Sequence, residues 1–219
     1  MNRILGWCVA ASIATASAAG MAQDSFGGGE ARPGGPATPA PPARQPVPGG
    51  APAAAGADLD KLMAKERQDL GVAPVSELHY GAMHGPTPAK IPGGQLITTK
   101  GLAALVQGRQ APFLLFDVLG GPEMLPGAIP AAGAAQPGSF DDEVQRGFGA
   151  WLEQTTRGDK RMALVFYCQS THCWMSYNAA LRAIRLGYAN VLWYRGGIEA
   201  WKEAGLSLAP SQRPAQRPQ

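Results

Sequence analysis

From residue 96 to residue 205, apolar residues follow two different spacings in turn. Short, nearly continuous apolar runs are typical of buried strands, and apolar residues three or four positions apart are typical of amphipathic helices. The runs predict strands at 96–97, 113–116, 162–167 and 190–194. The spaced segments predict helices at 98–108, 139–152, 174–186 and 198–204. Strands that alternate with helices indicate an α/β fold: a single domain with a mostly parallel sheet and helices on both faces.

The chain before and after this region has a different composition. Gly and Pro are more frequent than in an average protein, at 29 and 20 of the 219 residues, and most of the excess precedes residue 57. We expect residues 23–57 to form a disordered Ala/Pro/Gly linker, because so little apolar surface cannot offset the entropy of ordering the chain. Asp58 and Gly71 are suitable as the start and stop of a short helix. The remaining expected segments are this helix with an irregular lead-in over 58–94, a domain over 95–206 and a disordered tail over 207–219.

The first 22 residues are typical of a secretory signal peptide. A short n-region ends at Arg3, an apolar run follows over 4–14, and small residues extend to Ala22. The run is too short and too rich in Ala and Ser to span a bilayer, so we expect cleavage and no lasting membrane anchor. The mature protein is then expected to be periplasmic or secreted.

Charge and histidine placement limit the classes of partner. Charged residues make up 16% of the chain, and the formal net charge of +3 comes from scattered rather than clustered Lys and Arg. We therefore expect no nucleic-acid partner. His79 and His84 lie in a Pro/Gly-rich stretch without a nearby third ligand, so no metal site is expected. Three tryptophans fall on apolar patterns and are expected in the core: Trp151, Trp193 and Trp201.

Two cysteines, Cys168 and Cys173, remain once Cys8 is removed with the signal peptide. They are five positions apart in a chain bound for an oxidising compartment. A loop that curls around the first sulfur could bring the second close enough to bridge. Closing so short a loop is worth only about 2 kcal/mol in the chain-entropy model, so the bond would be labile rather than structural. The sequence leaves open whether it forms.

Cys168 directly follows the predicted strand at 162–167, and five residues separate it from the next predicted helix. Ligands of open α/β sheets bind outside the carboxyl ends of the strands, where a helix N-terminus also favours negative charge. Backbone N–H groups of residues 169–173 could converge on this sulfur and favour the thiolate, which is the reactive form. The alternative is that Cys168 is a small apolar residue at the end of a buried strand.

The region from about Leu96 to Gly205 resembles rhodanese-like domains. In that family a strand delivers a nucleophilic Cys into a cradle loop, and a Gly-Gly-hydrophobic-x-x-Trp motif closes the domain. The residues that carry the resemblance are 165–170, 178–181, Gly187, Tyr188, Asn190, Val191, 196–201 and Gly205. Upstream, the apolar strand that ends in Asp117 and the turn over 126–130 are similar to the family's strand ending in Asp and its Gly-His-Ile-Pro-Gly-Ala turn.

The resemblance implies that Cys168 is a nucleophile that forms a persulfide and that Asp117 supports the site. The loop residues that it implies to line the substrate are Gln169, Ser170, Thr171, His172 and Cys173. Leu119 stands where many rhodaneses have Arg, and Cys173 stands where Arg often closes the loop. Both changes remove positive charge that would bind an anionic donor such as thiosulfate, and they leave His172 as the only titratable cation candidate in the loop.

Residues 173–180 resemble a narrower group of exported rhodanese-like proteins with a Cys-Trp motif. These proteins are associated with quinoprotein (PQQ)-dependent alcohol catabolism. The association is one of genomic company and implies no bound quinone, so we expect no cofactor.

Three functions are compatible with these patterns. In the leading hypothesis, an exported sulfurtransferase takes sulfane sulfur onto the Cys168 thiolate from a small sulfur-containing donor and passes it to a thiol acceptor. In the second, Cys168 and Cys173 form a thiol–disulfide redox module. In the third, a non-catalytic module binds a sulfur compound or another exported protein, which the two missing arginines favour.

Overall fold

The computed structural model describes residues 54–108 and 112–211. The expected signal peptide over 1–22, the expected linker as far as residue 53 and the end of the expected tail from residue 212 lie outside the described residues.

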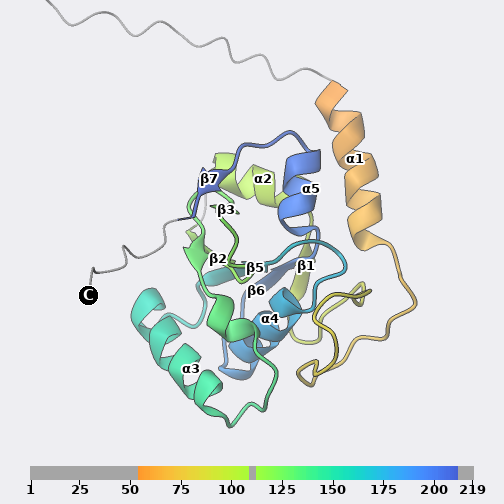
Figure 1. Ribbon diagram of the computed structural model, residues 1–219. Coiled ribbons are helices and arrows are strands. Elements are labelled where there is room, and N and C mark those ends of the chain that lie inside the picture. The colour runs from red at the N-terminus through yellow and green to blue at the C-terminus, as the bar shows by residue number, and fades with distance from the viewer. Residues whose placement is uncertain (1–53, 109–111, 212–219) are drawn as a thin grey trace, which may run out of the picture. The chain divides into compact units, whose positions relative to one another are not determined.

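A parallel sheet forms the centre of the domain, with strand order β1-β6-β5-β2-β4 (Figure 1). Its strands are β1 (Gln95–Ile97), β2 (Phe113–Asp117), β4 (Ile129–Pro130), β5 (Ala163–Tyr167) and β6 (Val191–Tyr194). Every pairing in this sheet is parallel. The central strand β5 lies between β6 and β2, so its carboxyl end is flanked on both sides.

Helices cover both faces of the sheet, and the expected α/β fold is confirmed. They are α1 (Ala54–Arg67), α2 (Thr99–Gly108), α3 (Glu143–Thr156), α4 (Met175–Arg185) and α5 (Gly197–Glu203). Figure 1 shows α2 and α5 on one side of the sheet and α3 and α4 on the other. Successive β5 residues alternate between the two cores: Leu164 and Phe166 join one cluster, whereas Val165 and Tyr167 join the other. This is the two-residue period of a strand that is buried on both faces.

Two of the three tryptophans expected in the core are buried there, and the third is not fully buried. Trp193 and Trp201 are buried in opposite clusters. Trp151 of α3 is only half-buried and packs against the edge of its cluster, with its ring 5.4 Å from that of Phe116.

The first helix differs from the sequence prediction at both ends. It begins at Ala54 rather than Asp58, so the last residues assigned to the linker are helical. Alanine has the highest helix propensity, and the Ala-rich run before Asp58 extends the helix. The helix ends at Arg67 rather than near Gly71, and the chain then follows an irregular path to residue 94.

Two segments for which no helix or strand was predicted contain short elements. The loop over 120–138 includes β3 (Glu123–Met124), β4 and a 3₁₀ turn, η1 (Ala132–Ala135). In the expected tail, β7 (Ala209–Pro210) pairs antiparallel with β3, and Ser211 N–H donates to Pro122 O at 2.8 Å. The prediction of a disordered tail from residue 207 is therefore wrong for 209–210, because pairing with a distant segment orders this short stretch.

The start of α3 was also predicted wrongly. Its N-cap is Asp142 rather than Ser139, and the Asp142 carboxylate accepts hydrogen bonds from Gln145 N–H at 2.7 Å and Ser139 N–H at 3.0 Å. The buried Arg182 of α4 donates to both Asp142 oxygens, at 3.0 and 2.9 Å. These hydrogen bonds from Arg182 hold the pKa of Asp142 at about 2. A capping residue in contact with a buried guanidinium thus joins α3 to α4.

Candidate functional site

Cys168 lies at the carboxyl end of β5 and is 1% exposed. Its carbonyl oxygen accepts a hydrogen bond from Ile198 N–H at 3.0 Å, which joins the loop to the first turn of α5. Gly197 has a φ of 64°, and a Cβ there would lie 2.6 Å from the Cys168 oxygen. Only glycine fits this position, because the backbone of the cysteine loop leaves no room for a side chain. The Gly-Gly motif is therefore explained by the close approach of two segments.

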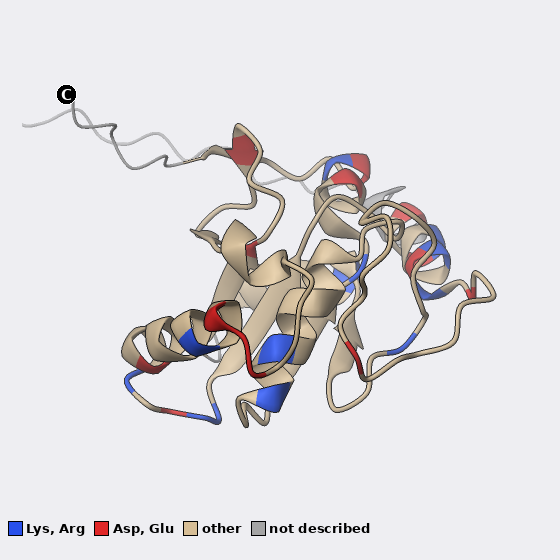
Figure 2. Cartoon of the chain, turned by 60° about the horizontal axis from the view of Figure 1, so that its bottom comes forward, with Lys and Arg blue, Asp and Glu red and all other residues tan. Residues whose placement is uncertain are grey.

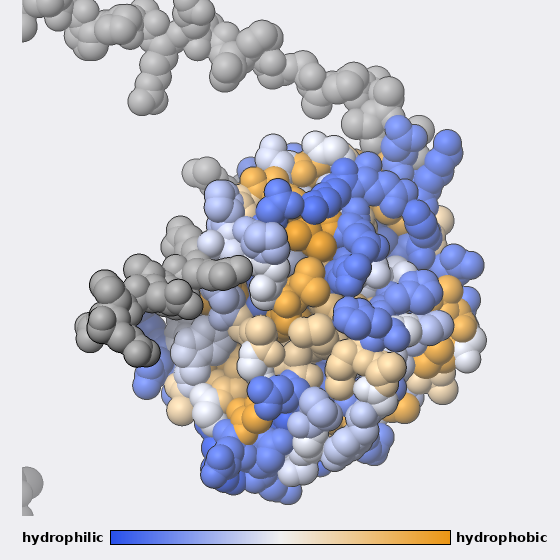
Figure 3. All heavy atoms as spheres, in the orientation of Figure 1, coloured by the Kyte–Doolittle hydropathy of each residue, from blue (hydrophilic) through white to orange (hydrophobic). Residues whose placement is uncertain are grey.

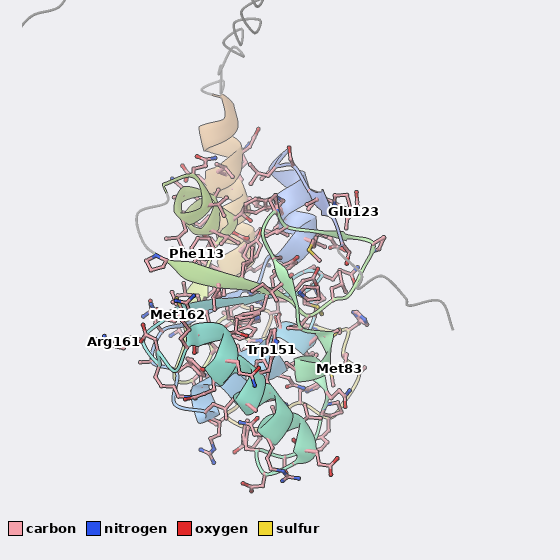
Figure 4. The ribbon with its side chains drawn as sticks, turned by 90° about the vertical axis from the view of Figure 1, so that its left-hand side faces the viewer. Met83, Phe113, Glu123, Trp151, Arg161 and Met162 are labelled. Atoms are coloured by element: carbon pink, nitrogen blue, oxygen red, sulfur yellow. A yellow bond between two sulfur atoms is a disulfide. The ribbon has the colours of Figure 1, made fainter. Side chains whose placement is uncertain are left out.

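Figure 4 indicates which edge of the sheet carries this site. The labelled residues Phe113 and Met162, at the amino ends of β2 and β5, lie on one side, and Glu123 and Met83 lie on the opposite side. Glu123 and Met83 belong to segments that flank the carboxyl ends of the strands, where Cys168 also lies. This is the edge at which α/β sheets bind their ligands.

A disulfide joins Cys168 to Cys173, with the two Cα atoms 6.3 Å apart. It closes a loop with a sequence separation of five residues. Cys173 is 0% exposed, so the bond lies below the surface. The question that the sequence left open is thus answered: the loop does bring the second sulfur to the first.

The loop keeps several backbone donors free. Cys173 N–H donates to Ser170 O at 3.2 Å, and the Thr171 hydroxyl lies 3.1 Å from Nδ1 of the exposed His172. Among the described residues, the backbone N–H groups of Gln169, Ser170 and Thr171 donate to no other protein group. Free N–H groups that follow a cysteine are the donors that a thiolate or another anion at this place requires.

A segment of the lead-in covers the Cys173 end of the loop; we call residues 79–88 the strap. His84 pairs antiparallel with Cys173. The His79 ring stacks on Trp174 with 4.1 Å between ring centroids. The hydrogen bonds between strap and loop are Gly85 N–H to His172 O (2.8 Å), Trp174 N–H to Met83 O (2.9 Å), and both Thr87 N–H (3.2 Å) and the Thr87 hydroxyl (2.6 Å) to Thr171 O. Sequence reasoning predicted only an irregular lead-in and missed this cover.

Arg195, which directly follows β6, holds the strap in place through hydrogen bonds to Thr87. It is buried, and it donates to the Thr87 hydroxyl at 3.0 Å and to Thr87 O at 2.7 Å. It also donates to the carbonyls of Glu66 and Gln68, at 2.8 and 2.7 Å, at the end of α1. Burial lowers the pKa of Arg195. Sequence reasoning also missed this residue. The available signal was its position: an Arg next to a buried strand must find hydrogen-bond partners.

Asp117 acts on the shape of the neighbouring loop rather than on the sulfur. Its Oδ1 accepts from Leu119 N–H at 2.7 Å and Gly120 N–H at 3.2 Å, and its Oδ2 accepts from the Tyr167 hydroxyl at 2.9 Å. The Tyr167 oxygen in turn accepts from Leu125 N–H at 2.9 Å. Burial, together with the charge of Asp117, raises the pKa of Tyr167. Asp117 therefore holds the loop that follows β2 in place beside the site.

An open pocket of about 440 Å³ lies beside the cysteine loop. It is lined by Leu119, Gly120, Gly121, Pro122, Glu123, Gln169, Ile198, Glu199 and Lys202. Lys202 forms an ion pair with Glu123 at 3.0 Å, and the Gln169 amide donates to Glu199 at 2.7 Å. In the described part of the chain, no Lys or Arg outside an ion pair lines this pocket. Figure 3 looks onto this edge of the sheet and shows an apolar area at its centre.

A smaller pocket of about 190 Å³ lies on the other side of the loop, between α1 and α5. Lys65 of α1 and Glu203 of α5 line it and form an ion pair at 2.9 Å. Figure 2 shows positive and negative residues interspersed over these two helices. The carboxylate of Glu66 is buried and accepts hydrogen bonds from Thr99 at the start of α2, so it caps that helix; burial raises its pKa.

Residues 54–108 and 112–211 contain no group of three or more His, Cys, Asp or Glu side chains that could hold a metal ion. None of the helices described there is long and apolar enough to cross a membrane.

The sheet, the two layers of helices and the cysteine loop at the carboxyl edge define an α/β domain with a candidate thiol site. Residues 101–204 match the family model of the rhodanese-like domain. The match is a similarity to that domain over just under half of the chain; α1, β1 and the strap precede the matched residues.

The crystal structure of a full-length protein from Lactobacillus plantarum is similar over 53% of this chain and 88% of its own, with 15% sequence identity and a TM-score of 0.37. No curated protein matches the chain.

Proposed function

We propose that this domain is a sulfurtransferase that carries sulfane sulfur as a persulfide on Cys168. The observation that carries the proposal is the position of Cys168 at the carboxyl end of β5, followed by a loop whose first three N–H groups have no protein partner. Such groups stabilise a thiolate, which is the nucleophile in sulfur chemistry. The rhodanese-like domain supports a function of this type in general.

The reaction begins from the reduced protein. A thiol reductant opens the disulfide, and the Cys168 thiolate then attacks the outer sulfur of a small donor and displaces the rest of the donor. The persulfide passes its outer sulfur to a thiol acceptor. Because the one cation that lines the open pocket is already paired with Glu123, an organic persulfide fits the pocket better than doubly charged thiosulfate does.

The test is sulfur transfer to a thiol acceptor by the reduced protein. Cys168→Ser should abolish transfer and keep the fold, because Ser nearly matches Cys in volume. Cys173→Ala should still take up sulfur on Cys168. A folded Cys168→Ser variant with full activity would contradict the nucleophile assignment, and so would loss of activity that is explained by unfolding alone.

The disulfide itself favours a second candidate, thiol–disulfide exchange with a protein or small-molecule thiol. In that case Cys173→Ala should trap mixed disulfides on Cys168, because the resolving thiol is gone. No persulfide should then form on Cys168 in any variant. Mass analysis of the variant after exposure to donor and acceptor separates the two candidates.

We also propose that the protein is exported and belongs with the Cys-Trp group. Export is supported by the n-region, apolar run and small residues at the start of the sequence, and a disulfide near the carboxyl edge agrees with an oxidising compartment. Trp174 of the Cys-Trp motif holds the strap through its contact with His79. Cell fractionation tests this proposal: an uncleaved cytoplasmic protein would contradict it.

A further inference from the structure

We propose that Cys173 is a resolving thiol that converts the Cys168 persulfide into sulfide, so that the domain reduces sulfane sulfur as well as carrying it. This inference rests on the proposed function, because it needs a persulfide on Cys168. It assigns a further activity to the same loop, the release of hydrogen sulfide.

Cys173 is within reach of a persulfide on Cys168. The sulfur of Cys173 is bonded to that of Cys168 while the loop, the strap and the flanking strands are all in place. After reduction and sulfur uptake, the same backbone holds the Cys173 thiol beside the inner sulfur of the persulfide. No rearrangement of the fold is required for the two to react.

Cys173 has no other partner within reach among the described residues. It is 0% exposed, and the residues on either side of it are bonded to the strap: His172 O accepts from Gly85 N–H, and Trp174 N–H donates to Met83 O. The strap therefore shields this thiol from donors and acceptors in solution. A thiol that is buried from solution but within bonding distance of Cys168 can attack only what is attached there.

The Cys168 end of the loop borders an open pocket, although Cys168 itself is 1% exposed. Gln169, the next residue, lines the open pocket of about 440 Å³ together with Ile198, whose N–H is bonded to Cys168 O. A donor or a reductant that enters this pocket reaches the Cys168 end of the loop, whereas the strap covers the Cys173 end. The two cysteines thus have different tasks: Cys168 exchanges sulfur with the outside, and Cys173 reacts from the inside.

The Cys173 thiolate attacks the inner sulfur of the Cys168 persulfide; the bond between the two cysteines forms, the bond between inner and outer sulfur breaks, and the outer sulfur leaves with its electron pair as HS⁻. The sulfane sulfur is reduced by two electrons, and the two cysteine sulfurs are oxidised to the disulfide. A dithiol reductant then attacks the Cys168 sulfur, becomes a disulfide itself and restores both thiols.

The experiment is a single turnover of the reduced, desalted full chain with glutathione persulfide in the absence of oxygen. Released sulfide, remaining protein thiols and the intact mass are measured over time. We expect one sulfide for each chain, the loss of two thiols for each sulfide, and a final mass equal to the disulfide form. In Cys173→Ala the mass should instead rise by one sulfur atom, and sulfide release should slow by roughly tenfold or more. A Cys168→Ser/Cys173→Ala variant corrects for sulfide from spontaneous decay of the donor.

The outcomes separate the two proposals. If wild-type protein keeps its persulfide and releases no sulfide above the control, the inference is wrong while the proposed function stands. If folded Cys173→Ala gains no sulfur on Cys168, the proposed function itself fails. Should Cys173→Ala not fold, the ratio of sulfide to lost thiols in wild-type protein still decides: sulfide without thiol loss overturns the inference.

Discussion

Arg182 is fully buried and makes three hydrogen bonds through Nη1 and two through Nη2. Two of them reach the Asp142 carboxylate, and the others reach oxygens near the start of α3. A buried charge is tolerated only when it is paired and hydrogen-bonded, and this one is paired with the residue that caps α3. The pair is a contact between two residues far apart in the sequence, so no local pattern predicted it.

This pair sets a pH dependence of stability. The pKa of Asp142 falls from 3.8 to about 2 on folding, so the carboxylate stabilises the fold fully above pH 4 and loses that effect as the pH falls towards 2. Asp142→Asn should lower the free energy of unfolding by about 2 kcal/mol at neutral pH. The gap to wild type should shrink between pH 4 and pH 2 in urea unfolding. Asp141→Asn, at the exposed neighbouring position, is the control and should change little; a gap that persists at pH 2 would contradict the assignment.

Leu119 allows a test of the pocket at the scale of one side chain. It lines the open pocket, at the position where the resemblance to rhodanese-like domains leads us to expect Arg. Leu119→Arg should improve kcat/KM for thiosulfate by about tenfold, because it adds a fixed cation that can hydrogen-bond to an anionic donor. Leu119→Met is the control, since it keeps the size without the charge. Equal kcat/KM for both variants would mean that thiosulfate does not enter through this pocket.

At the scale of elements, the regular helices and strands could be predicted, but the contacts that hold irregular segments against them could not. The apolar run at 113–116 and the spaced apolar residues of α4 are patterns within one segment that indicate a buried strand and a half-buried helix. The strap has no such period: its order comes from Thr87 and Gly85, which bond to the cysteine loop. The β3–β7 pair likewise depends on two segments that are distant in the chain.

The candidate site shows the same division. Placing Cys168 at a strand end required only the local pattern, and the structure has it there. The sequence left open whether Cys173 lies close to Cys168, and the structure shows that the two are bonded. The cover of Cys173 by the strap could not be predicted from the sequence, because it depends on Arg195, whose partners lie more than one hundred residues away.

Arg195 gives a prediction for the strap. Arg195→Met should leave the carbonyls of Thr87, Glu66 and Gln68 without this partner and lower the free energy of unfolding by about 3 kcal/mol. Hydrogen exchange should rise in the strap, and a dithiol should reduce the Cys168–Cys173 bond faster. Arg185→Met, at an exposed position of α4, is the control. Unchanged exchange and unchanged reduction rate in Arg195→Met would show that the strap holds without it.

At the scale of the whole molecule, two cores on opposite faces of the sheet carry the stability, and the disulfide adds little. The buried residues of both clusters are spread over helices and strands along the whole domain, whereas the bond closes only the loop over 168–173. Opening a loop this short should cost about 2 kcal/mol. A redox cycle at this site is therefore compatible with a fold that persists in both states.

Denaturant unfolding with and without reductant tests this. Wild-type protein should remain folded when reduced, with a free energy of unfolding lower by about 2 kcal/mol. Cys173→Ala should show no effect of the reductant, which makes it the control. Complete unfolding of reduced wild-type protein would mean that the bond is structural, and a reaction that begins from the dithiol would then be ruled out.

The central claim is that Cys168 carries sulfur, and the mass of one variant tests it most directly. Reduced Cys173→Ala, exposed to glutathione persulfide and quenched, should gain one sulfur atom on the peptide that contains Cys168. Without the resolving thiol this persulfide should persist until a thiol acceptor is added. A folded variant that gains no sulfur, or whose Cys168 is found only as a mixed disulfide with the donor, would contradict the account.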